Sequence, residues 1–186
     1  MADRDFQRAS SRLEKIICGG ESITEELIQK LQNHTSAQIY NQYGPSETCV
    51  AVSFALVNEK SRITAGKPMD NCRLYVLDKW MQPLPVGVYG DLYVGGLCVG
   101  RGYRNNRELT EQKFVPNPYE SDDLLYQTGD IACWSPQGEI ILAGRIDKQV
   151  KIRGLRIELE DISSCLASYT GVHGYGFCFG SRLEFP

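Results

Sequence analysis

Residues 41–48 carry the side chains with the most evident chemistry in this sequence. They combine the ring of Tyr43, a glycine-proline turn, the hydroxyl of Ser46 and the carboxylate of Glu47. The turn presents the hydroxyl and the carboxylate together. An aromatic ring can stack on a base, a hydroxyl can bond to a phosphate oxygen, and a carboxylate can hold a divalent metal. These groups therefore suit an adenine face, a phosphate and a divalent metal ion.

Two later segments place charged side chains beside glycines. Residues 126–130 offer a second carboxylate, Asp130, which we expect beside a turn at Gly129. Residues 144–154 form a charged segment with a glycine at each end, and this segment contains Arg145. The sequence thus holds three separated segments that are rich in polar chemistry.

In this order and spacing, the three segments resemble the adenylation domains of nonribosomal peptide synthetases. The wider family includes acyl-CoA synthetases and luciferases. The resemblance implies a fragment of an ATP-dependent enzyme that activates an amino acid as an aminoacyl-AMP. In such an enzyme the acyl group then passes to a phosphopantetheine thiol on a peptidyl carrier domain, so the amino acid and that domain are the implied partners.

The resemblance also implies a role for each residue of the first segment. Tyr43 would pack on the adenine ring of ATP, and Asn41 would bond to the adenine amino group. Gly44 would lie in the same nucleotide-binding segment. Ser46, where the family usually has threonine, would bind a phosphate, and Glu47 would hold Mg²⁺; both would act in catalysis.

The later segments supply the ribose contacts and a hinge. By resemblance, Asp130 would accept hydrogen bonds from the ribose hydroxyls, and Arg145 would reach the same ribose. Asp147 would be the hinge about which a small C-terminal domain swings. The amino-acid pocket would be lined by Ile17, Gly19, Gln42, Val50 and Ala51.

Two groups that this reaction needs are not found within the chain. The family's phosphate loop with its lysine would precede residue 1, and a second lysine would follow residue 186. We therefore expect a fragment that is inactive alone, because electrostatic stabilisation around the phosphates usually supplies the largest share of catalysis. The missing N-terminal part of the large domain would be a required partner.

Other interpretations remain open at this stage. Tyr43 could close a strand before the glycine-proline turn, Ser46 could be a helix N-cap, and Arg145 could pair with Asp147 or Glu139. The parent could be an acyl- or aryl-CoA ligase. The chain could also be a non-catalytic nucleotide-binding remnant, or a generic binding domain that joins an α/β part to a β-barrel.

The elements that must position these residues begin with a strand–helix–strand unit. The apolar run 15–18 predicts a strand, a capping box at Ser22 opens a helix over 22–33, and 38–40 forms a second strand. Such a crossover usually joins parallel strands. The predicted inward face of the helix carries Leu27, Ile28 and Leu31.

Beyond the first segment, short apolar runs with glycine and proline between them predict a distorted antiparallel β-barrel. A short helix is expected over 107–114, a hairpin over 134–139 and a further helix over 157–169. The predicted strands cover 50–52, 74–77, 91–94 and 140–142.

The expected fold is thus mixed α/β, in three parts. Residues 1–12 are a ragged N-terminal end, and 13–146 form the C-terminal part of the large domain. Residues 147–186 comprise the hinge and the beginning of a small α+β domain.

Composition excludes several classes of protein. The 186 residues carry a net charge of -3, which argues against a nucleic-acid partner. Seven cysteines without a CxxC pair, together with only two histidines, favour reduced thiols over disulfides or a zinc site. We see neither a signal peptide nor an apolar run of membrane-spanning length, so no membrane is involved and the expected location is cytoplasmic.

Overall fold

The computed structural model describes residues 10, 12–57, 62–147, 149–152 and 155–169. The chain divides into two compact units, Met1–Asp147 and Lys148–Pro186. Each unit is described by itself. Most of the predicted N-terminal end and all of the chain beyond residue 169 lie outside the described residues.

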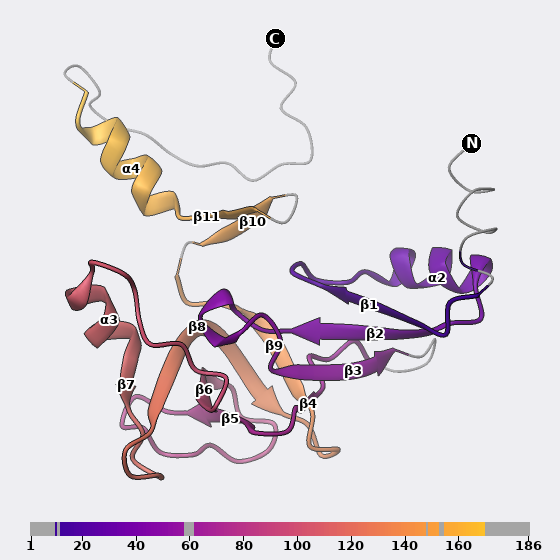
Figure 1. The fold of residues 1–186 in the computed structure, drawn as a ribbon, viewed down its shortest axis with the longest axis horizontal. Helices are drawn as coiled ribbons and strands as arrows, with labels where there is room; N and C mark the ends of the chain where they lie inside the picture. The colour runs from indigo at the N-terminus through magenta and orange to yellow at the C-terminus, as the bar shows by residue number, and fades with distance from the viewer. Residues whose placement is uncertain (1–9, 11, 58–61, 148, 153–154, 170–186) are drawn as a thin grey trace. The chain divides into compact units, whose positions relative to one another are not determined.

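The first sheet of the large unit contains the predicted crossover. Strands β1 (Lys15–Gly19) and β2 (Gln38–Tyr43) are parallel, and helix α2 (Glu25–His34) joins them (Figure 1). Strand β3 (Ser53–Val57) pairs antiparallel with β2, and β4 (Lys67–Pro68) pairs antiparallel with β3. The strand–helix–strand prediction is therefore confirmed.

Helix α2 begins later than the capping box predicted. Thr24, not Ser22, is the N-cap, because its side chain accepts a hydrogen bond from the backbone N–H of Leu27 at 3.2 Å. Ile23, just before the cap, joins Ile28 in one buried cluster, as in a hydrophobic staple. Leu27 is 42% exposed, so its predicted place on the inward face is wrong, whereas Ile28 is buried and Leu31 packs on the cluster.

The second sheet is antiparallel throughout and curls into a half-barrel, which confirms the predicted fold class. Strand β8 is its longest strand and pairs with three others, yet the sequence had predicted no strand there. The elements of this part are β5 (Cys72–Leu77), β6 (Gly90–Gly96), α3 (Arg107–Lys113), β7 (Phe114–Pro116), β8 (Leu124–Trp134) and β9 (Ile140–Arg145). Its core includes Leu74, Val76, Leu92, Val94, Ala132 and Ile140.

The predicted strand over 50–52 is wrong. Cys49 and Val50 adopt positive φ angles of 60° and 75°, which bend the chain sharply before β3 begins. This turn is tight, because a Cβ on Gly44 would lie 2.4 Å from the carbonyl oxygen of Val50. The backbone N–H of Val52 then donates to the carbonyl of Tyr43 at 2.9 Å, so the loop closes directly onto the end of β2.

The small unit contains a hairpin and a helix. Strands β10 (Val150–Ile152) and β11 (Leu155–Ile157) are antiparallel, and helix α4 (Leu159–Ala167) follows. The helix is shorter than the predicted 157–169 because Ile157 belongs to β11. Among the described residues, no helix combines the length and apolar composition needed to cross a membrane.

The first stability prediction concerns Gly66, which links the two sheets of the large unit. Its φ is 80°, its carbonyl accepts the N–H of Ile140, and a Cβ there would lie 1.9 Å from the carbonyl oxygen of Phe54. Gly66→Ala should therefore lower the free energy of unfolding by roughly 3 kcal/mol in urea denaturation. Gly138→Ala is the matched control. Its φ is 73°, and no atom lies within 4 Å of an added Cβ, so only left-handed backbone strain is expected, which costs about 1 kcal/mol of unfolding free energy. Equal losses in the two variants would contradict the steric argument.

Candidate functional site

A β-bulge in β8 places Asp130. Between two regular pairs of β6 and β8, one residue of β6, Leu92, faces residues 128–130 of β8. The Thr128 hydroxyl holds the bulge, because it donates to the carbonyl of Leu92 at 2.8 Å and accepts the N–H of Asp130 at 3.0 Å. Gly129 provides the positive φ of 79°. Asp130 therefore lies within a strand, not beside a turn as predicted from the sequence.

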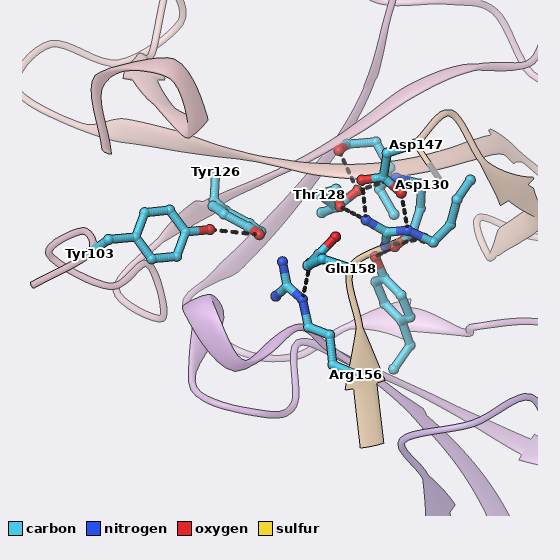
Figure 2. A network of polar contacts seen from close by, with 10 residues as sticks. Tyr103, Tyr126, Thr128, Asp130, Asp147, Arg156 and Glu158 are labelled. Carbon is cyan, nitrogen blue, oxygen red and sulfur yellow. Dashed lines mark hydrogen bonds and ion pairs between the residues drawn. The ribbon is translucent and has the colours of Figure 1, made fainter. Parts of the chain in front are cut away.

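The Asp130 carboxylate is the centre of a polar network (Figure 2). The Tyr43 hydroxyl donates to its Oδ2 at 2.5 Å, and Nη1 of Arg145 donates to its Oδ1 at 2.9 Å. In the same guanidinium, Nε donates to Oδ1 of Asp147 at 2.6 Å, and Nη2 donates to Oδ2 of Asp147 at 2.7 Å. Nη2 also donates to the carbonyl of Thr128 at 3.0 Å. Three predicted residues from distant segments thus meet at one point. The pairing of Arg145 with Asp147 that the sequence left open is also present.

Gly129 is required where the network crosses the bulge. A Cβ at this position would lie 2.6 Å from Oδ2 of Asp147 and 2.7 Å from Nη2 of Arg145. Its carbonyl also accepts the N–H of Ile146 at 2.9 Å. A side chain here would push apart the ion pair that orients Arg145 toward Asp130.

Burial sets the protonation chemistry of this network. It raises the pKa of Asp130 above its ordinary value, although the Tyr43 hydroxyl and Arg145 act to lower it. Burial and then the charge of Asp130 raise the pKa of Tyr43 well above its ordinary value, so this hydroxyl stays a donor. Burial alone would lower the pKa of Arg145, but its hydrogen bonds to Asp147 and the charge of Asp130 raise it. The network therefore presents a carboxylate held between two donors.

Glu47 lies on a short 3₁₀ helix, η1 (Ser46–Thr48), directly after the glycine-proline turn. Its Oε1 accepts a hydrogen bond from the Tyr103 hydroxyl at 2.8 Å, and its backbone carbonyl accepts the N–H of Gly100 at 2.8 Å. Thr48 is buried, and its hydroxyl bonds back to the carbonyl of Pro45 at 3.1 Å. Ser46 is exposed at the start of the helix and is not an N-cap.

Tyr126 joins the Glu47 group from β8. Its hydroxyl lies 3.4 Å from that of Tyr103, and the ring of Phe114 contacts both tyrosine rings, with centroids 5.0 and 5.6 Å away. Burial, then the hydrogen bond with Tyr103 and the charge of Glu47, raise the pKa of Tyr126. The Tyr126 hydroxyl therefore stays protonated near this carboxylate.

The first two segments consequently meet at two places. Tyr43 bonds to Asp130, and Glu47, four positions later, interacts with Tyr126, four positions earlier. The Tyr43–Asp130 pair thus lies at one of these places, and the Glu47 carboxylate lies at the other. A ligand that reaches both places would contact the Tyr43 ring and the Asp130 carboxylate, which accepts hydroxyl groups, at one place. At the other place it would contact the Glu47 carboxylate, which suits a cation.

The remaining nucleotide candidate, Asn41, has a defined contact. Its side-chain Nδ2 donates to the carbonyl of Thr64 at 2.7 Å. Asn41 and Tyr43 lie on the same face of β2, since they are two residues apart. The amide oxygen of Asn41 is the atom that could accept the amino group of an adenine.

The structure brings three of the five predicted pocket residues together. Gly19 pairs with Gln42 across β1 and β2, and a Cβ on Gly19 would lie 3.1 Å from the Cβ of Gln42. Nε2 of Gln42 donates to the carbonyl of Val50 at 3.4 Å. Ile17 lies on the same face as Gly19, and the side chains of Ile17 and Val50 are 56% and 64% exposed. Ala51 is half-buried in the turn before β3.

Sequence reasoning missed three residues of this site: Thr128, Tyr126 and Tyr103. The first two belong to the same segment as Asp130, so their position beside a predicted carboxylate was the available signal. Tyr103 ends a glycine-rich stretch, 100–103, for which the sequence analysis predicts no site residue. Its contact with Glu47 depends on the loop geometry, which the sequence does not display.

Glu47 is the one residue that the sequence analysis predicts as a metal ligand. In the described part of the chain, no group of three His, Cys, Asp or Glu side chains could hold a metal ion. Mg²⁺ often takes one or two carboxylates together with substrate phosphates and water. A single half-buried carboxylate therefore fits a metal that arrives with a nucleotide, but not a site built from protein ligands only.

Comparison with known proteins identifies the family. The sequence model of the AMP-binding enzymes matches residues 1–104. The chain belongs to the AMP-binding enzyme family. Tyrocidine synthase 3 of Brevibacillus parabrevis is 41% identical over 169 residues, which cover 88% of this chain and 3% of that protein.

Solved structures of AMP-binding enzymes share the fold. PA1221, an NRPS protein containing adenylation and PCP domains, superposes with a TM-score of 0.76 at 28% identity, covering 84% of this chain and 33% of its own. Holo-AB3403, a four-domain nonribosomal peptide synthetase bound to AMP and glycine, gives 0.67 at 38% identity, covering 87% and 12%. This chain therefore spans a third or less of each of the three proteins named here.

Proposed function

We propose that this chain supplies the nucleotide-binding part of an ATP-dependent adenylation domain that activates an amino acid. The observation that carries the proposal is the double contact between residues 43–47 and 126–130. The Tyr43–Asp130 hydrogen bond, and the Tyr103 hydroxyl that lies between Glu47 and Tyr126, support a single site with a tyrosine ring and Asp130 at one end and Glu47 at the other. The similarity to peptide synthetases supports an amino acid over other carboxylic acids.

The nucleoside end would be formed by Tyr43, Asp130 and Arg145. The tyrosine ring would stack on adenine, a contact typically worth roughly 1–3 kcal/mol. The Asp130 carboxylate has lone pairs beyond those used by its two present donors, so it can accept ribose hydroxyls. Arg145 would keep that carboxylate oriented and reach the same ribose.

The phosphate end would be formed by Ser46 and Glu47. The exposed hydroxyl of Ser46 can donate to a phosphate oxygen, and the Glu47 carboxylate can take one position around Mg²⁺. When bound there, the metal would neutralise phosphate charge as it develops. The residues of the chain would thus orient the α-phosphate for attack by the substrate carboxylate.

In the proposed reaction, a carboxylate oxygen of the amino acid forms a bond to the α-phosphorus, and pyrophosphate leaves. The aminoacyl-AMP would then transfer its acyl group to the phosphopantetheine thiol of a carrier domain, releasing AMP. Gly19, Gln42 and Val50, with Ile17 and Ala51, would line the amino-acid pocket. Asp147, the last residue of the large unit, would act as the hinge. We place this reaction in the cytoplasm, where free thiols stay reduced.

The substrate class is tested by ATP–pyrophosphate exchange. The polypeptide that carries this segment would be captured from source cells with an antibody against residues 62–147. Exchange is expected with at least one amino acid and not with fatty or aryl acids. The isolated chain should give exchange at background level, since the two lysines expected to stabilise the phosphates are not found within it.

Each other outcome would overturn part of the proposal. Exchange with a fatty or aryl acid alone would identify an acyl- or aryl-CoA ligase. A captured polypeptide of 20.9 kDa without exchange would identify a non-catalytic remnant. Exchange by the isolated chain well above background would contradict the expected need for the missing lysines.

A further inference from the structure

We infer that Tyr103 is a positioning residue, which holds the Glu47 carboxylate in the orientation that a nucleotide-borne Mg²⁺ requires. The inference rests on the proposed function and adds to it a residue from the glycine-rich loop 100–103. It follows from a two-point hold: the loop bonds to Glu47 through both the backbone and the side chain.

The first point of the hold is at the backbone. The N–H of Gly100 donates to the carbonyl of Glu47 at 2.8 Å. A Cβ at Gly100 would lie 2.8 Å from that same oxygen, so only glycine allows this approach without a shift of the chain. The contact fixes the main chain of the 3₁₀ helix against the loop.

The second point is the Tyr103 hydroxyl, and Tyr103 is itself held in place by other contacts. Its backbone N–H donates to the Thr110 hydroxyl at 2.9 Å, and its ring contacts Phe114 edge-on, with centroids 5.6 Å apart. Gly102 adopts a φ of 114° and lies so close to Thr110 that a Cβ there would be 2.3 Å from its Cγ2. The loop is thus shaped to bring this hydroxyl to Oε1 of Glu47.

The chemistry of the donor matters for a metal ligand. A tyrosine hydroxyl restricts the rotation of a carboxylate through a hydrogen bond but does not cancel its charge. The contrast within the site is Asp130, whose carboxylate is bonded to a guanidinium and therefore suits hydroxyl groups of a ligand. A neutral donor that orients the Glu47 carboxylate lowers the entropy lost when a cation binds there.

Tyr103→Phe tests the role, because it removes the hydroxyl and keeps the ring. ATP binding to the chain would be measured by calorimetry with Mg²⁺ and with EDTA, for the wild type and the variant. We expect the variant to lose about tenfold in affinity with Mg²⁺, as for one hydrogen bond to a charged group, and less than about twofold with EDTA. Tyr119→Phe is the matched control, since the Tyr119 hydroxyl donates to the backbone carbonyl of Met81, outside the proposed site.

A Glu47→Gln background shows whether Tyr103 acts through Glu47. There, Tyr103→Phe should cost no further affinity with Mg²⁺. Equal losses of ATP affinity with Mg²⁺ and with EDTA would show that the hydroxyl stabilises the fold and does not position a metal ligand. No loss in either condition would show that the hydroxyl has no effect on ATP binding. Both results overturn the inference. If ATP fails to bind the wild type at all, the proposed function fails instead, and the two failures are thereby distinguished.

Discussion

Replacing Asp130 with asparagine is expected to weaken AMP binding to this chain by about 100-fold. The asparagine oxygen can still accept one hydrogen bond, but the two ribose hydroxyls lose their charged acceptor. A hydrogen bond to a charged group contributes about 1.5 kcal/mol or more, so two of them correspond to roughly two orders of magnitude. Isothermal titration calorimetry of AMP into the wild type and Asp130→Asn measures the difference directly.

The ligand itself provides the control for this experiment. 2′,3′-Dideoxy-AMP has no ribose hydroxyls, so wild type and Asp130→Asn should bind it with affinities within about threefold of each other. A 100-fold loss with this analogue too would show that Asp130 supports the site by holding Tyr43 and Arg145 and does not contact the ribose.

The second large effect is on stability. Arg145→Met would leave Asp130 and Asp147 facing each other without the cation that both now contact, at 2.9 and 2.6 Å. Removing one partner of a largely buried ion pair strands charge away from water, and here it strands two carboxylates. We expect the free energy of unfolding to fall by about 3 kcal/mol near neutral pH. Urea denaturation followed by tyrosine fluorescence measures this loss.

The deficit of Arg145→Met should shrink as the pH is lowered. The pKa of Asp130 in the folded chain already lies above its ordinary value, so protonation of this group favours the folded state. This contribution is present below the ordinary carboxyl pKa and is lost as pH rises through the raised value. The guanidinium acts to lower that pKa, so the variant should raise it further and regain stability as the pH falls below neutral.

An exposed ion pair provides the control variant. Arg107 pairs with Glu111 at 2.6 Å, but its side chain is 91% exposed. Arg107→Met should therefore change stability by less than about 0.5 kcal/mol at neutral or lower pH. If Arg145→Met were equally harmless, or if its deficit grew on acidification, the electrostatic account of the network would be wrong.

Much of the fold could be predicted because local patterns and tertiary packing agree there. The apolar run at 15–18, the helix after it and the strand at 38–40 all form as predicted, and Ile28 and Ile39 are buried, although Ile17 and Leu27 are exposed. The second sheet followed from short apolar runs between glycines and prolines. The three polar segments were close enough to the family's pattern that Tyr43, Asp130 and Arg145 could be named as partners.

The remainder depends on long-range geometry. Buried and exposed side chains do not alternate regularly along strand β8, because residues 128–130 form a bulge. A bulge interrupts the two-residue period on which strand prediction depends. The run 50–52 is apolar like a strand, but positive φ angles at Cys49 and Val50 make it a turn. Tyr103 reaches Glu47 only because two glycines allow close backbone approaches, and those distances exist only in the folded chain.

The most direct test of the nucleotide site is calorimetric titration of AMP into the folded wild-type chain and into Tyr43→Ala. The account predicts saturable binding of one AMP per wild-type chain, and a loss of about tenfold or more in Tyr43→Ala from the missing stacking contact. Circular dichroism would establish that both proteins are folded. Absence of saturable binding to the folded wild type, or undiminished binding to Tyr43→Ala, would contradict the proposal that a nucleoside stacks on Tyr43 and contacts Asp130.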